Sequence, residues 1–461
     1  MLFSGIPFLF YFLPLVVILY FLLPKVLRNG FLLFASLIFY AWGEPRYVLL
    51  MAAAIVLFYS YGLAIGAAKT GWVKKLWLSA SVLTGVAMLG LFKYADFALE
   101  NWNRLTGMSV PLLKLALPIG ISFYTFQCIS YTVDVYRKTV SPQRNIIHFG
   151  TYVALFPQLI AGPIVRYVDV AEELENRQAK WEDVAQGLGH FLLGLGKKVL
   201  IANPLGELTS IFRESGEQSV LFYWLYAIAF MLHIYFDFAG YSDMAIGLGR
   251  IFGFRFPKNF DYPYISRSIT EFWRRWHMTL GGWFRDYVYI PLGGNRVSKI
   301  KWLRNILAVW LLTGLWHGAA WTFVIWGLLF AACLLVEKWL PLQKLPNFLR
   351  HGYVLLIVLI SFVIFNASDL TEAGRDIAGL FGGLGLPLVS PPALYYLRSY
   401  GILLLIGILG ATPLPYKIFT WCENRWPVTR WLLPAGALVL LLVCTAYLVD
   451  GSFNPFLYFR F

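Results

Sequence analysis

Residues 306–336 decide the fold. They read ILAVWLLTGLWHGAAWTFVIWGLLFAACLLV and contain no Asp, Glu, Lys or Arg. A transmembrane helix needs about 20 apolar residues at a rise of 1.5 Å each, so this stretch is longer than one straight crossing. Gly314 and Gly318, followed by two alanines, therefore predict a break or a close helix contact. His317 lies beside that predicted break.

The composition of the whole chain agrees with a membrane protein. Of 461 residues, 59% are hydrophobic and 13% are charged, against roughly 25% charged in an ordinary soluble domain. We expect an all-α polytopic membrane protein with one domain over residues 1–461, about 10–12 transmembrane helices, and additional half-helices and interfacial helices. The candidate spans are 2–23, 27–42, 47–68, 76–94, 111–135, 148–165, 185–203, 219–247, 303–317, 318–337, 352–366, 393–411 and 432–449.

The basic residues indicate topology rather than nucleic-acid binding, because they stand in short connections between apolar runs. Residues 1–24 contain no Lys or Arg, whereas Lys25 and Arg28 follow the first run. The positive-inside rule then places the N-terminus outside. Residues 250–304 hold eleven basic residues and three acids, the strongest cytoplasmic signal in the chain. Six acids and two bases in residues 169–183 suggest a helix on the membrane surface.

Other common sites are not indicated by the sequence. Cys128, Cys333, Cys422 and Cys444 stand singly in apolar stretches, so neither a disulfide framework nor a metal site is expected. No phosphate-binding loop and no HExxH motif is present, which leaves nucleotide hydrolysis and zinc proteolysis unsupported.

His317 is the first candidate for chemistry. If the helix after Arg304 starts at the cytoplasmic interface, His317 lies about 18 Å inside a core of roughly 30 Å. Burial at that depth favours the neutral imidazole, which can act as a general base. The alternative is a histidine that is hydrogen-bonded within the bundle, but ionisable residues at membrane depth usually serve a function.

Two further stretches carry polar groups. Residues 268–296 mix aromatic and basic side chains around His277, a pattern that fits either a headgroup interface or a phosphorylated ligand. Residues 235–249 place Asp237 and Asp243 in an apolar run, six positions apart. These two carboxylates face different sides of a regular helix, so each is expected to bond a neighbouring helix or line a cavity.

Four motifs together resemble the membrane-bound O-acyltransferase (MBOAT) family, in its bacterial alginate O-acetyltransferase branch. They are FDFAGYSDMAIG, KNFDYPYISRSITEFWRRWHMTLGGWFRDYVYIPLGGNR, LTGLWHGAAWTFVIWG and the terminal NPFLYFRF. The resemblance implies an MBOAT fold around a central funnel, with a core catalytic region at about residues 110–340. It assigns the proposed catalytic histidine to His317 and the second family histidine to His277.

The resemblance also implies the reaction. Acetyl-CoA would act as a cytoplasmic donor substrate, with no bound cofactor, and the acetyl group would pass to a hydroxyl acceptor at the outer face of a bacterial cytoplasmic (inner) membrane. An SGNH-hydrolase-like partner outside the membrane would complete the transfer to a polysaccharide such as alginate or peptidoglycan. We expect His317 to be the general base and His277 to position the thioester or the acceptor. The candidate binding residues are Arg274, Arg275, Trp276, Trp316, Asn259, Asp243 and Arg285.

Two alternative functions stay open at this stage. One is D-alanyl transfer to teichoic acid, which uses a loaded carrier protein as donor. The other is a membrane carrier that moves an intact acetylated lipid or sugar, with His317 as a gating proton site.

Overall fold

The computed structural model describes residues 1–160, 162–426, 428–451 and 453–454. These residues form helices and no β-strand, as the sequence predicted. Most of the terminal motif, residues 455–461, lies outside the described residues. Contacts divide the chain into two units, Met1–Phe191 with Ser242–Lys258, and Leu192–Tyr241 with Asn259–Phe461. Whether the chain acts as one domain stays a prediction.

The first unit is built from apolar helices near the N-terminus. α2, α3 and α7 pack against one another in this unit, and α6 packs against α3, α4 and α7. Its helices are η1 (Phe8–Phe12), α1 (Leu13–Leu22), α2 (Lys25–Gly43), α3 (Val48–Ala67), α4 (Gly71–Leu89), η2 (Gly90–Tyr94), α5 (Ala95–Thr106), α6 (Ile121–Arg137), α7 (Ile146–Ala154), α8 (Phe156–Leu159) and α9 (Tyr167–Asn176).

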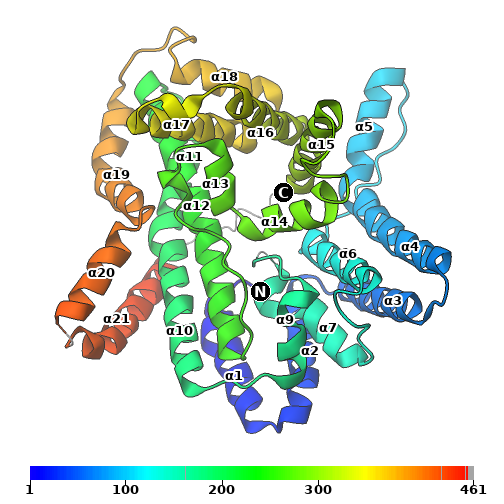
Figure 1. Cartoon of the computed structure of the whole chain (residues 1–461). Coiled ribbons are helices and arrows are strands. Elements are labelled where there is room, and N and C mark those ends of the chain that lie inside the picture. Colours follow the sequence, from blue (N-terminus) through cyan, green and yellow to red (C-terminus); the bar gives the residue numbers. More distant parts are fainter. Residues whose placement is uncertain (161, 427, 452, 455–461) are drawn as a thin grey trace. The chain divides into compact units, whose positions relative to one another are not determined.

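Two helices run from one unit into the other, and the second unit holds the remaining helices. α10 (Trp181–Gly196) and α12 (Val220–Ile251) are the shared helices. The second unit contains η3 (Lys197–Ala202), α11 (Asn203–Glu214), η4 (Pro263–Ile265), α13 (Ile269–Arg275), α14 (Met278–Phe284), η5 (Arg285–Tyr289), α15 (Lys299–His317), α16 (Trp321–Trp339), η6 (Leu342–Lys344), α17 (Asn347–Asn366), α18 (Leu370–Leu380), α19 (Pro391–Gly410), α20 (Leu414–Arg425) and α21 (Thr429–Asp450). These elements can be followed in Figure 1.

Eight of the described helices are long and apolar enough to cross a membrane, and a shorter apolar helix covers Phe8–Leu22. Two expected spans are interrupted. Residues 111–120 precede α6 without helical structure, and the run at 148–165 divides into α7 and α8. The expected surface helix over 169–183 was wrong as one element, because α9 ends at Asn176 and α10 begins at Trp181.

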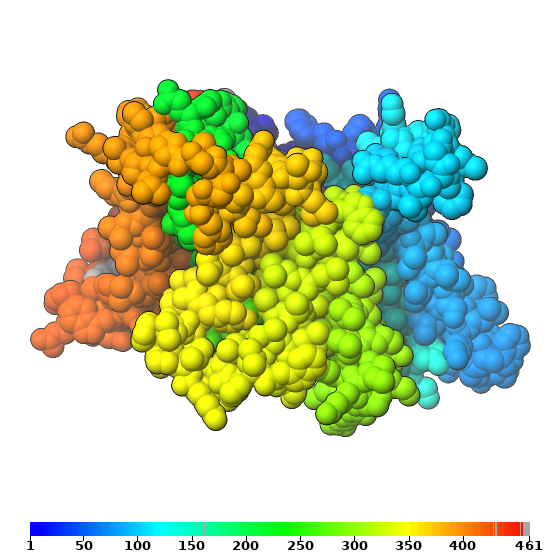
Figure 2. All heavy atoms as spheres, turned by 90° about the horizontal axis from the view of Figure 1, so that it is seen from above, coloured from blue at the N-terminus to red at the C-terminus, as the bar shows by residue number. Residues whose placement is uncertain are grey.

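The decisive stretch forms two helices rather than one. α15 ends at His317, and Gly318 takes an extended conformation before α16 begins at Trp321. The two helices then pack closely: a Cβ atom at Gly314 would lie 2.3 Å from the Phe323 carbonyl oxygen. The predicted break and the predicted close contact are therefore both present. Figure 2 shows the segment from α15 to α18, coloured from green-yellow to gold, as a continuous surface.

Candidate active site

The short helix α13 is fixed at its N-terminus by side chains. Ser268 caps the helix by accepting a hydrogen bond from the Glu271 amide at 2.9 Å. Glu337, near the end of α16, accepts hydrogen bonds from the amides of Ile269 and Thr270 and from the Thr270 hydroxyl. A carboxylate at a helix N-terminus meets unpaired amides and the positive end of the helix dipole, so Glu337 holds α13 against α16.

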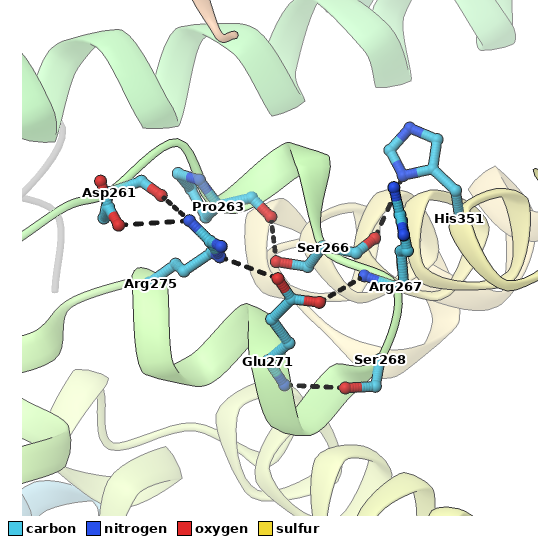
Figure 3. A network of polar contacts seen from close by, with 8 residues as sticks. All are labelled: Asp261, Pro263, Ser266, Arg267, Ser268, Glu271, Arg275 and His351. Carbon is cyan, nitrogen blue, oxygen red and sulfur yellow. Dashed lines mark hydrogen bonds and ion pairs between the residues drawn. The ribbon is translucent and has the colours of Figure 1, made fainter. Parts of the chain in front are cut away.

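Arg275 closes a second set of contacts around α13 (Figure 3). Its guanidinium donates to the Asp261 carbonyl and carboxylate oxygens at 3.1 and 3.2 Å and to Glu271 at 3.0 Å. Glu271 also accepts from the Arg267 amide at 3.0 Å. Nδ1 of His351, on α17, lies 3.1 Å from the carbonyl oxygen of Ser266 in the same loop. Arg275 is therefore occupied in holding the loop before α13.

His277 lies between α13 and α14 in a left-handed backbone conformation, with φ of +43°. Its Nδ1 lies 3.2 Å from Oδ1 of Asn259, and the Met278 amide donates to the Asn259 carbonyl oxygen at 2.9 Å. The side chain is buried. Burial lowers the pKa of His277 to about 3, because a low-dielectric environment disfavours the imidazolium. The ring is therefore neutral at physiological pH.

His317 is the last residue of α15 and is 6% exposed. Its ring lies 5.0 Å from the Trp326 ring and 5.2 Å from the Phe365 ring, both edge to face. Trp316 connects the two histidines, because its ring lies 5.6 Å from that of His277 and 5.1 Å from that of His317. The structure thus brings both sequence-predicted histidines into one aromatic cluster within the second unit.

Two adjoining cavities lie in the second unit, and the first is lined by Met278, next to His277 in the chain, and by Thr313, four positions before His317. The first, of about 570 Å³, is mainly lined by apolar side chains such as Trp273 and Trp310, and Thr313 also lines it. The second, of about 640 Å³, is lined by Arg267, Arg274, Lys338 and Arg350 together with Glu337. The two share the lining residues Thr270, Arg274, Tyr289, Ile306 and Leu334. A basic part that continues into an apolar part suits an anionic molecule with an apolar arm.

The other predicted binding residues have different positions. Arg274 lines both cavities and Arg285 lines the first. Arg275 belongs to the loop network, and Trp276 stacks on Phe272 at 5.6 Å in the aromatic core. Asp243 belongs to the first unit, whereas both histidines belong to the second.

Sequence reasoning missed several polar residues of the second unit. Lys338 and Arg350 line the basic cavity although each stands at a helix end far from the motifs. Lys198 pairs with Asp237 at 2.5 Å, and both side chains are almost fully buried. The expectation that Asp237 bonds a neighbouring helix is confirmed. A lysine inside the apolar run of η3 was the available signal, since a buried charge needs a partner.

Comparison with known proteins identifies the family of this chain. The model of the membrane-bound O-acyltransferase family, MBOAT, matches residues 48–368. The chain belongs to the MBOAT family. It is therefore a multi-pass membrane protein and an O-acyltransferase.

Individual relatives cover most or all of the chain. It is 44% identical over 390 residues to the probable alginate O-acetylase AlgI of Azotobacter vinelandii, covering 83% of this chain and 78% of the relative. It is 34% identical to the peptidoglycan O-acetyltransferase of Helicobacter pylori, over all of this chain and 98% of the relative. The teichoic acid D-alanyltransferase of Bacillus subtilis is 29% identical, over 54% of this chain and 67% of the relative.

Proposed function

We propose that this MBOAT protein moves an acetyl group from cytoplasmic acetyl-CoA to a hydroxyl acceptor at the outer face of the bacterial inner membrane. The product would be an O-acetylated cell-surface or secreted polysaccharide. The relatives named for alginate and peptidoglycan O-acetylation support this substrate class. We expect an SGNH-hydrolase-like partner outside the membrane to complete the transfer.

The adjoining cavities carry the proposal. Their basic part offers Arg267, Arg274, Lys338 and Arg350 to the phosphates of CoA. Their apolar part reaches Thr313, which stands one helical turn before His317 on α15. A CoA molecule with its phosphates in the basic part would direct its thioester toward His317.

The reaction needs one base that first accepts a proton and then returns it. The acceptor hydroxyl oxygen attacks the thioester carbonyl carbon while His317 takes the hydroxyl proton. The carbon–sulfur bond then breaks, and the proton passes to the leaving thiolate, which departs as free CoA. The His317 ring lies edge to face against Trp326 and Phe365, which hold it in place for this proton transfer.

Replacement of His317 tests the proposal. His317→Ala should reduce transfer of labelled acetyl from acetyl-CoA to a hydroxyl acceptor by at least about a hundredfold, because a positioned general base contributes that much or more. The matched control is His190→Ala, which removes an exposed histidine on α10. Near-normal activity of a folded, membrane-inserted His317→Ala protein would remove His317 from the mechanism.

The donor separates the alternative functions. Purified protein should transfer labelled acetyl from acetyl-CoA and should not require an acyl-loaded carrier protein. A strict requirement for a D-alanyl-loaded carrier would favour D-alanyl transfer. Movement of an intact acetylated molecule without release of CoA would favour the membrane carrier.

A further inference from the structure

A hydrogen bond from the backbone amide of Thr279 fixes the orientation of the Asn259 carboxamide. Its Oδ1 accepts a hydrogen bond from the Thr279 hydroxyl at 2.8 Å and from the Thr279 backbone amide at 3.3 Å. A backbone N–H can donate but cannot accept, so the atom that faces it must be the carboxamide oxygen and not the nitrogen.

That oxygen fixes the proton on the imidazole of His277. Oδ1 of Asn259 lies 3.2 Å from Nδ1 of His277. Because a carboxamide oxygen only accepts, Nδ1 must carry the ring hydrogen, and the neutral ring then has a bare lone pair on Nε2. Nε2 is buried and has no hydrogen-bond partner among the described residues.

Among the described residues, the ring of His277 packs against uncharged aromatic side chains. Its ring contacts are Phe238 at 4.7 Å, Phe260 at 6.4 Å and Trp316 at 5.6 Å. Each of these neighbours is uncharged, as is Asn259. A buried acceptor without a partner costs free energy, which makes Nε2 a position where a bound molecule would complete the site.

We infer that Asn259 and Thr279 are positioning residues that hold His277 as its Nδ1–H tautomer, so that Nε2 accepts a hydrogen bond from a substrate. This inference rests on the proposed function, whose base is His317. A bare Nε2 cannot donate a hydrogen bond to the thioester carbonyl oxygen, so His277 does not polarise the carbonyl. It instead receives an O–H of the acceptor or an amide N–H of the pantetheine arm of the donor.

The tautomer can be measured without activity. Solid-state NMR of protein with ¹⁵N-labelled histidine, in lipid bilayers at neutral pH, should show the non-protonated nitrogen of His277 at ε2. The His277 signals are assigned by their loss in His277→Gln. The variant Asn259→Ala should give a mixture of tautomers. A wild-type ring with its proton on Nε2 would overturn the inference even if acetyl transfer is normal.

The pH titration of His277 in the variant Asn259→Asp provides a second test. A carboxylate still accepts from Thr279 and from Nδ1–H, but its charge stabilises the imidazolium and should raise the pKa of His277 by about 1–3 units. The pH at which the His277 ring becomes protonated, followed by its ¹⁵N signals, should therefore move to higher pH in this variant. An unchanged midpoint of that titration would contradict the inference. The control is Asn203→Asp, at a buried asparagine that bonds Asn454.

Comparing the KM for the acceptor with the KM for acetyl-CoA identifies the group that His277 binds. In Asn259→Ala, loss of one hydrogen bond should raise one KM by up to about tenfold. A rise confined to the acceptor KM indicates an acceptor hydroxyl, and a rise confined to the acetyl-CoA KM indicates the pantetheine amide. If Asn259→Ala changed neither KM nor kcat, the positioning role would be overturned. Wild-type protein that transfers no acetyl would contradict the proposed function, while the NMR result would still decide the tautomer.

Discussion

At the residue scale, two adjacent arginines have different surroundings and should have different effects. Arg274 lines both cavities, whereas Arg275 bonds Asp261 and Glu271. Neighbouring positions on a helix point to different sides, so adjacency in the sequence does not imply a shared role.

We therefore predict a separation between binding and stability. Arg274→Ala should raise the KM for acetyl-CoA several-fold with little change in thermal stability, because it removes a charge from the basic cavity. Arg275→Ala should lower stability by about 1–2 kcal/mol, because it removes several hydrogen bonds to charged or carbonyl groups. Steady-state kinetics and thermal unfolding in detergent check both effects. Equal KM changes in the two variants would contradict the assignment.

The sequence predicted best those features that depend on residues close together in the chain. An uncharged run that is too long for one crossing predicted the break at Gly318 and the position of His317. The role of Glu337 could not be predicted in this way, because its partners on α13 lie 67 and 68 positions away in the chain. Only the folded arrangement brings this carboxylate to those amides.

At the element scale, α13 depends on a carboxylate from α16. Glu337→Gln keeps the size of the side chain but removes the charge that interacts with the α13 N-terminus. We expect stability to fall by about 1 kcal/mol. Glu207→Gln, at an exposed position on α11, is the control. A Glu337→Gln protein that is indistinguishable from wild type in thermal unfolding would argue against the cap.

The hairpin of α15 and α16 should tolerate no added side chain where the helices meet. At Gly327, a Cβ atom would lie 2.3 Å from the Trp310 carbonyl oxygen, so Gly327→Ala must push the helices apart. We predict a loss of stability of roughly 1–3 kcal/mol and a lower kcat, since α15 carries His317. Gly401→Ala on α19 is the matched control, because nothing lies within 4 Å of its added Cβ atom. Thermal unfolding and turnover measured for both variants test this contrast.

At the scale of the whole molecule, the formal net charge of the chain is +14, and four basic residues line one of the two cavities. Electrostatic attraction for CoA should weaken with salt, because the screening length falls from about 10 Å at 0.1 M to about 3 Å at 1 M ionic strength.

We therefore predict that the KM for acetyl-CoA rises with ionic strength while kcat changes little. A short neutral acetyl thioester that lacks phosphates is the control substrate, and its KM should depend only weakly on salt. Initial rates at several salt concentrations give both constants. Equal salt dependence for the two thioesters would show that the basic cavity does not receive the phosphates.

The uninterrupted α16 sets a fixed spacing inside the second unit. It begins three residues after Gly318 and carries Glu337 near its other end, so about 24 Å of rigid helix separates Trp321 from Glu337. A helix of fixed length sets the distance between its two ends. A donor anchored by its charged end must have an arm long enough to span this interval, and thioesters with shortened arms should remain unreactive however reactive their acyl group is.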